Sequence, residues 1–178
     1  MWTRAARAAT WILLAATTVG CAGPSRELRA VAHDGDYTLV ITSPGATWAA
    51  ADPIELEATL TYYGSQPEAT LTGSGSGVLL FTVEELDGDR PMDAAWHDDC
   101  RTYTIGPHDP IASTYRKSGG FTDEDPNAAF YRAYFRDPVF RLPPGAWKIT
   151  ALARFRTGAE CGGGRAVMLE APLTITVQ

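Results

Sequence analysis

The amino-acid sequence predicts an all-β protein: an antiparallel β-sandwich of seven to nine short strands, with one short helix inserted near residues 126–136. Two patterns lead to this prediction. Apolar and polar residues alternate with a period of two in several segments, as they do in strands that bury one face. Turn residues interrupt these segments about every 8–12 residues, which is typical of sandwiches. No part of the sequence resembles a βαβ repeat or a solenoid.

The first half of the domain shows the clearest alternation. In the segment 52–64 the apolar residues share one face of a strand: Ile54, Leu56, Ala58, Leu60 and Tyr62. The glycine-rich segment 72–77 is predicted to be a flexible loop. Strands are expected in the segments 37–42, 52–64, 78–86, 100–105 and 112–117.

A helix is predicted at 126–136, where the alternation breaks. Asp125 suits a helix cap, Pro126 suits the first helical turn, and the aromatic residues that follow recur every three or four positions. Strands resume after the turn at 143–145. They are predicted over the segments 146–156, 166–171 and 173–177.

The first 20 residues are predicted to be a signal peptide. Arg4 and Arg7 form a basic start without a nearby acidic residue. Residues 8–19 then supply a mostly apolar run, which is shorter than the roughly 20 residues that a membrane-spanning helix needs. The domain that follows is therefore expected to be exported.

The end of this segment resembles a bacterial lipobox. The residues Val-Gly-Cys at 19–21 match its last three positions, whereas Thr18 departs from the aliphatic first position. We therefore expect lipidation at Cys21 and attachment to the cell membrane, facing outside the cytoplasm. Cleavage after Ala22, which would secrete the protein, and an uncleaved anchor are the alternatives.

Residues 21–35 are predicted to be a tether, and residues 36–178 the folded domain. Asp34-Gly35 is also a hairpin-type turn signal. The segment 28–32 is therefore an alternative first strand, paired with the strand at 37–42.

The cysteine count predicts one disulfide. The chain has three cysteines, an odd number for an exported protein. If Cys21 is acylated or removed with the leader, Cys100 and Cys161 remain to pair with one another.

The charge of the chain argues against nucleic acid as a partner. The sequence has 15 basic and 21 acidic residues, and loss of the leader removes two arginines, which leaves a net charge of −8. A surface of this sign repels phosphate backbones.

Three segments resemble the strands of bacterial Ig-like domains: DPIELEATLTYYG at 52–64, VLLFTVEELDG at 78–88 and LPPGAWKITALARF at 142–155. The outline is similar to single-domain Ig-like exported lipoproteins and, more distantly, to BsuPI-type proteinase-inhibitor domains. The resemblance implies an Ig-like sandwich but carries no function across. Region 96–140 matches neither group, and proteinase inhibition is a further alternative by analogy of fold.

The predicted helix supplies most of the candidate binding residues. At helical spacing Phe130 and Tyr134 share one stripe, and Tyr131 and Phe135 share another. One stripe is expected to cap the sandwich, while the other has the tyrosine and arginine composition of a binding hot spot. Burial of both stripes is the alternative. The predicted binding surface consists of Tyr131, Arg132, Phe135, Arg136 and, from a loop, Trp96.

These observations lead us to expect a non-enzymatic module without a cofactor, which binds a protein or an envelope polymer. No nucleophile elbow, catalytic carboxylate pair or glycine-rich phosphate loop stands in a workable context. The alternative is a metal site, catalytic or stabilising, because imidazole and carboxylate groups are ligands for Zn²⁺ and Ca²⁺. Its candidate ligands are His97, Asp98, Asp99 and His108.

Overall fold

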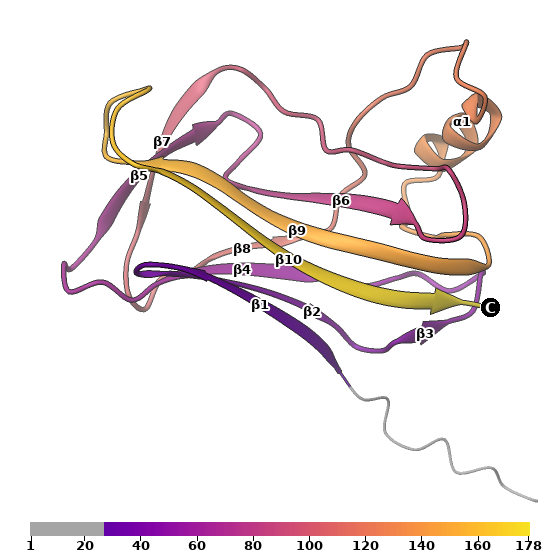
Figure 1. The fold of residues 1–178 in the computed structure, drawn as a ribbon, viewed down its shortest axis with the longest axis horizontal. Helices are drawn as coiled ribbons and strands as arrows, with labels where there is room; N and C mark the ends of the chain where they lie inside the picture. Colours follow the sequence, from indigo (N-terminus) through magenta and orange to yellow (C-terminus); the bar gives the residue numbers. More distant parts are fainter. Residues whose placement is uncertain (1–26) are drawn as a thin grey trace, which may run out of the picture.

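The structure is a computed structural model that describes residues 27–178, and in it two β-sheets lie face to face (Figure 1). The four-stranded sheet has the order β1-β2-β4-β8, with bounds Leu28–Asp34, Tyr37–Ser43, Glu57–Tyr62 and Ile111–Thr114. The other sheet has the order β3-β10-β9-β5-β7, with bounds Thr47–Trp48, Ala166–Val177, Gly145–Thr157, Ala69–Ser74 and Cys100–Ile105. A sixth strand, β6 (Leu79–Glu85), pairs with β9 beside β5. The predicted β-sandwich is confirmed, but residues 27–178 form ten strands rather than seven to nine, and β3 pairs with β10 in parallel rather than antiparallel.

The core lies between the two sheets, and alternation along the strands decides which residues enter it. From the four-stranded sheet, Leu39, Ile41 and Leu60 are fully buried. Ile149 and Ala151 of β9 meet them from the other sheet. Burial of an aliphatic side chain of the larger kind contributes about 1.5–3 kcal/mol, so these facing rows hold the layers together.

The first strand lies inside the segment 21–35, which the sequence analysis assigned to a tether. β1 pairs with β2 in an antiparallel hairpin whose turn is Asp34-Gly35-Asp36-Tyr37, with Gly35 at a positive φ of 57°. The alternative strand at 28–32 is therefore correct, and the sheet begins at Leu28. The predicted signal peptide and the lipidation site at Cys21 lie outside the described residues.

The strands β5 and β10 are longer than the sequence predicts. β5 occupies Ala69–Ser74 and so includes the first residues of the predicted loop 72–77, since it pairs with β7 along its whole length. β10 continues through Pro172, which separated two predicted strands. Near Pro172 this strand pairs with β9 on one edge only. Proline has no backbone N–H to donate, and the other edge of the strand needs no donor at this point.

The inserted helix is α1, Ala128–Arg136, close to the predicted range. In Figure 1 it appears on the far side of β6 and β9 from β1 and β2. Arg90, from the turn after β6, stands between α1 and the sheet: its guanidinium lies 4.6 Å from the ring centre of Phe130 and 5.4 Å from that of Trp147. No helix within residues 27–178 is long and apolar enough to cross a membrane.

Candidate binding surface

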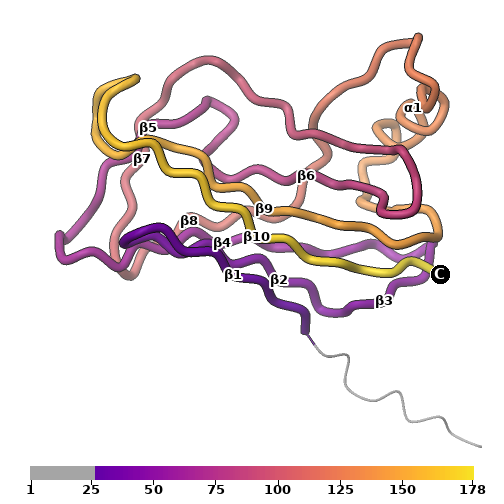
Figure 2. Tube along the Cα trace, viewed as in Figure 1, coloured from indigo at the N-terminus to yellow at the C-terminus, as the bar shows by residue number. Residues whose placement is uncertain are grey.

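The connection from β6 to β7 builds the candidate site. Figure 2 shows it returning along β6 toward β7. Met92 and Val83 exchange backbone hydrogen bonds of 3.0 and 2.7 Å, which fix the start of this return. Near its end the buried Ser74 hydroxyl donates to the His97 carbonyl at 2.7 Å and accepts from the His97 backbone N–H at 3.1 Å. These bonds hold residues 92–97 against the six-stranded sheet.

Trp96 lies between these two attachments and is partly buried. The guanidinium of Arg154, on β9, stacks over its indole at 4.9 Å from the ring centre. Ala153 and Phe155, the neighbours of Arg154, point into the core, so Arg154 and Trp96 lie on the outer face of the sheet. A cation over an indole face contributes about 0.5–1 kcal/mol at an exposed position.

Trp96 lines an open cleft of about 750 Å³, which we call the acidic cleft. Its walls come from the 91–99 connection, the Gly119-Gly120 turn and the helix. The residues that define it are Asp93, Trp96, Asp98, Asp99, Asp125 and Tyr131. It therefore combines two aromatic rings with four carboxylates.

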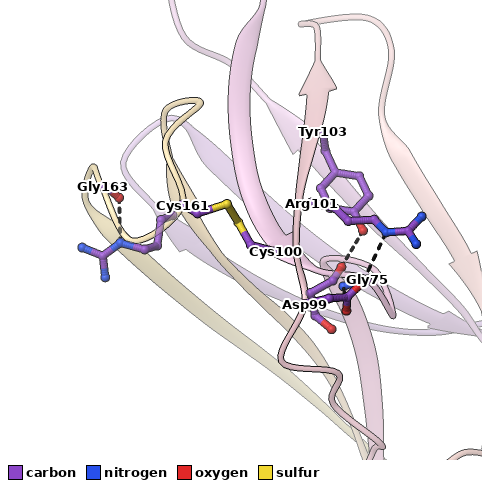
Figure 3. Close-up of a disulfide and its surroundings, with 9 residues drawn as sticks. Gly75, Asp99, Cys100, Arg101, Tyr103, Cys161 and Gly163 are labelled. Carbon is purple, nitrogen blue, oxygen red and sulfur yellow. Dashed lines mark hydrogen bonds and ion pairs between the residues drawn. A yellow bond between two sulfur atoms is a disulfide. The ribbon is translucent and has the colours of Figure 1, made fainter.

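The four carboxylates make this cleft negative. Asp99 accepts a hydrogen bond from the Gly75 N–H at 2.9 Å and pairs with Arg101 at 3.4 Å (Figure 3). Asp125 accepts a hydrogen bond from the Asn127 N–H at 2.7 Å. No Lys or Arg side chain belongs to the lining of the cleft, so it favours groups that donate hydrogen bonds.

A second cavity of about 370 Å³ adjoins the first on the outer face of the six-stranded sheet, and we call it the disulfide groove. Its lining includes Thr72, Trp96, Cys100, Arg154, Arg156 and Met168. The segment Trp96–Asp99 lines both cavities. The two cavities therefore form one surface, divided by that segment.

The Cys100–Cys161 disulfide, predicted from the cysteine count, is present and borders this groove (Figure 3). It joins the start of β7 to the loop between β9 and β10. Arg156 supports the same loop by donating to the carbonyls of Gly163 and Gly164, each at 2.7 Å.

The helix buries a different pair of aromatic residues from either predicted stripe. Tyr131 and Tyr134, three positions apart, are buried, whereas Phe130 and Phe135 are half-buried. Tyr131 is only 5% exposed and its hydroxyl donates to the Pro91 carbonyl at 2.8 Å. It was predicted to lie on the binding surface; instead it packs in the core and contributes only to the base of the acidic cleft.

The other predicted helix residues lie outside the acidic cleft. Phe135 is parallel to the ring of Phe121, with ring centres 6.1 Å apart. Arg132 pairs with the Asp123 carboxylate at 2.7 Å, and Arg136 is exposed. The structure therefore places Trp96 and Tyr131 of the predicted set in the lining of the acidic cleft and leaves the other three outside that lining.

Tyr134 explains why this face of the helix is buried. Its hydroxyl shares a 2.5 Å hydrogen bond with that of Tyr115, and Lys117 Nζ donates to the carbonyls of Tyr134 and Asp137 at 2.6 and 2.7 Å. Burial raises the pKa of Tyr115 to about 12 and also raises that of Tyr134. Both hydroxyls therefore stay protonated at neutral pH, and the pair docks the helix.

The residues of the predicted metal site are not grouped. Asp99 precedes β7 and His108 follows it, so a strand of six residues, roughly 20 Å long, separates them. Within residues 27–178 there is no group of three or more His, Cys, Asp and Glu that could hold a metal ion. The cluster of ligands that the metal-site alternative requires does not form within the described residues.

Sequence reasoning missed several residues of the surface, among them Thr72, Arg154 and Met168 in the disulfide groove. Alternation along 146–156 places Arg154 opposite the core, but nothing in the local sequence indicates that Trp96 packs on it. No family model matches the chain, and no curated protein matches it.

Proposed function

We propose that the protein is a non-enzymatic binding module of the bacterial cell envelope, anchored by a lipid at Cys21, and that it binds a protein or a polymer of the envelope. The single observation that carries this proposal is the Trp96–Asp99 segment, which lines two adjoining cavities. The proposal also takes the sandwich to be of the Ig-like type, which the resemblance of its strands favours.

The size and lining of the two cavities support a binding role. Ligand sites typically occupy about 300–1,000 Å³ and combine aromatic walls with a few polar groups. Both cavities fall in this range. Trp96 is fixed by Arg154 and by the attachments of its segment at Met92 and His97, so little side-chain freedom is lost when a partner binds.

We expect Trp96→Ala to lower binding to isolated cell envelopes at least about tenfold, because tryptophan anchors commonly contribute 2 kcal/mol or more. Binding is measured by co-sedimentation of the mature protein with envelopes over a range of concentrations. The matched control is Tyr63→Ala, which removes a ring that is 67% exposed and belongs to neither cavity. Equal binding by wild type and Trp96→Ala, with Tyr63→Ala unchanged, would exclude this surface.

The lipid anchor has a separate test. Cells that express the full chain should incorporate radiolabelled palmitate into it, and Cys21→Ala should abolish the label and release the protein from the membrane fraction. Label that persists in Cys21→Ala, or its absence from wild type, would rule out lipidation at this position.

A further inference from the structure

The floor of the disulfide groove holds a buried hydroxyl without a partner. Leu71 of β5 points into the core, so Thr72 points to the outer face, where the groove lies. Thr72 is 3% exposed, and its Oγ1 is the one buried side-chain polar atom among residues 27–178 that makes no hydrogen bond. Such a group is costly because it has lost water without gaining a partner. Because Oγ1 is closed off from solvent, a ligand hydroxyl in the groove would supply the missing bond once the side chains that cover Oγ1 shift aside.

Both signs of charge surround this hydroxyl. Asp98 and Asp99 line the groove together with Arg154 and Arg156. Arg156 is occupied by loop carbonyls, whereas the contact of Arg154 is with the Trp96 ring. A strongly anionic ligand would meet the aspartates and a strongly cationic one the arginines. An uncharged ligand whose groups both donate and accept hydrogen bonds can bond to the aspartates, the arginines and the threonine hydroxyl alike.

The apolar part of the groove fits the same kind of ligand. Trp96 and Met168, the latter 64% exposed, offer flat apolar surface next to the polar groups. A pyranose ring has C–H faces that pack on such surface and a rim of hydroxyls that hydrogen-bond to the groups around it. The adjoining acidic cleft offers four carboxylates as acceptors for further hydroxyls.

We propose that the disulfide groove and the acidic cleft are adjoining subsites for an uncharged glycan, which packs on Trp96 and bonds to the Thr72 hydroxyl. This inference rests on the proposed function and narrows its partner to a carbohydrate polymer. The glycan crosses the Trp96–Asp99 segment, since that segment lines both subsites.

Calorimetric titration of the mature protein tests the class of ligand. The probes are four uncharged oligosaccharides (hexa-N-acetylchitohexaose, cellohexaose, maltohexaose and mannohexaose), with hexalysine and hexaglutamate as charged counterparts. We expect at least one oligosaccharide to bind to the wild type. Trp96→Ala should lower the affinity for that oligosaccharide at least tenfold, and both peptides should bind more weakly than it does. Failure of all four at millimolar concentration, or tighter binding of a charged peptide, overturns the proposal.

Thr72→Val gives an independent readout. It removes the unpaired hydroxyl at nearly constant volume, so we expect the Tm of the free protein to rise while affinity for the bound oligosaccharide falls about tenfold. Thr72→Ser should keep the affinity of the wild type. Thr174→Val, at an exposed position of β10 outside both cavities, should not change the affinity. Unchanged affinity in Thr72→Val excludes the hydroxyl as a ligand contact and overturns the proposal.

The two proposals fail in different ways. Loss of envelope binding in Trp96→Ala, with no oligosaccharide bound, would leave the binding module standing and show that its partner is a protein or a charged polymer. Envelope binding that does not depend on Trp96 would overturn both proposals.

Discussion

Replacing Cys100 and Cys161 together by serine should lower the free energy of unfolding by about 4 kcal/mol. The bridge closes a loop with a sequence separation of 61 residues, and its main effect is to restrict the unfolded chain. A loss of this size is a large part of the 5–15 kcal/mol that stabilises a typical domain. Urea denaturation of the mature protein, followed by circular dichroism, measures it.

Reductant provides the control for this experiment. It should shift the urea midpoint of wild type toward that of the double variant and leave the double variant unchanged. Intact mass under denaturing conditions should rise by the mass of two hydrogen atoms on reduction. Equal masses with and without reductant would mean that both thiols are free, and equal midpoints would mean that the bridge contributes nothing.

Trp147→Ala should lower the free energy of unfolding by about 3–5 kcal/mol, because it removes the largest fully buried side chain, which lies near the start of β9. Trp147 is 0% exposed, and its indole N–H donates to the Pro143 carbonyl at 3.0 Å. Its loss opens a cavity and removes one of the two rings that Arg90 contacts. Thermal and urea denaturation should show a lower midpoint with the far-ultraviolet spectrum retained at low temperature.

Trp48→Ala is the matched comparison. Trp48 lies on the two-residue strand β3, is only partly buried, and donates through its indole N–H to the Gly45 carbonyl at 3.2 Å. Because Trp48 is only partly buried, Trp48→Ala should lower the free energy of unfolding by less than half as much as Trp147→Ala. Equal losses in the two variants would contradict the full burial of Trp147 in the core.

The local sequence predicted those strands and that helix whose pattern of apolar residues is complete within one short segment. The alternation from Ile54 to Tyr62 and from Trp147 to Phe155 identifies the core faces of two strands without any knowledge of their partners. The helix followed from the change to a spacing of three and four. The disulfide followed from counting, because Cys100 and Cys161 are the two cysteines that remain if Cys21 is acylated or removed.

The candidate site was harder to predict because its residues come from distant segments. Trp96 stood out as an aromatic residue in a loop, yet Arg154 lies 58 positions away and Thr72 lies in a segment that was expected to be a loop. Tyr131 was assigned to the surface because helical spacing gives the stripes of a helix but not which of them faces the protein. The contact between Tyr134 and Tyr115 decides that orientation.

The sequence by itself determined which residues enter the core of its clearest strands, where the helix lies and which cysteines pair. Each of these follows from the periodicity of one strand or helix, or from a count. Only the tertiary structure decided that β5 extends into the glycine-rich segment, that Tyr131 is buried, and that the Trp96–Asp99 segment lines two cavities. These features depend on pairing and packing between segments far apart in the chain, and no local pattern records which distant segment will be the partner.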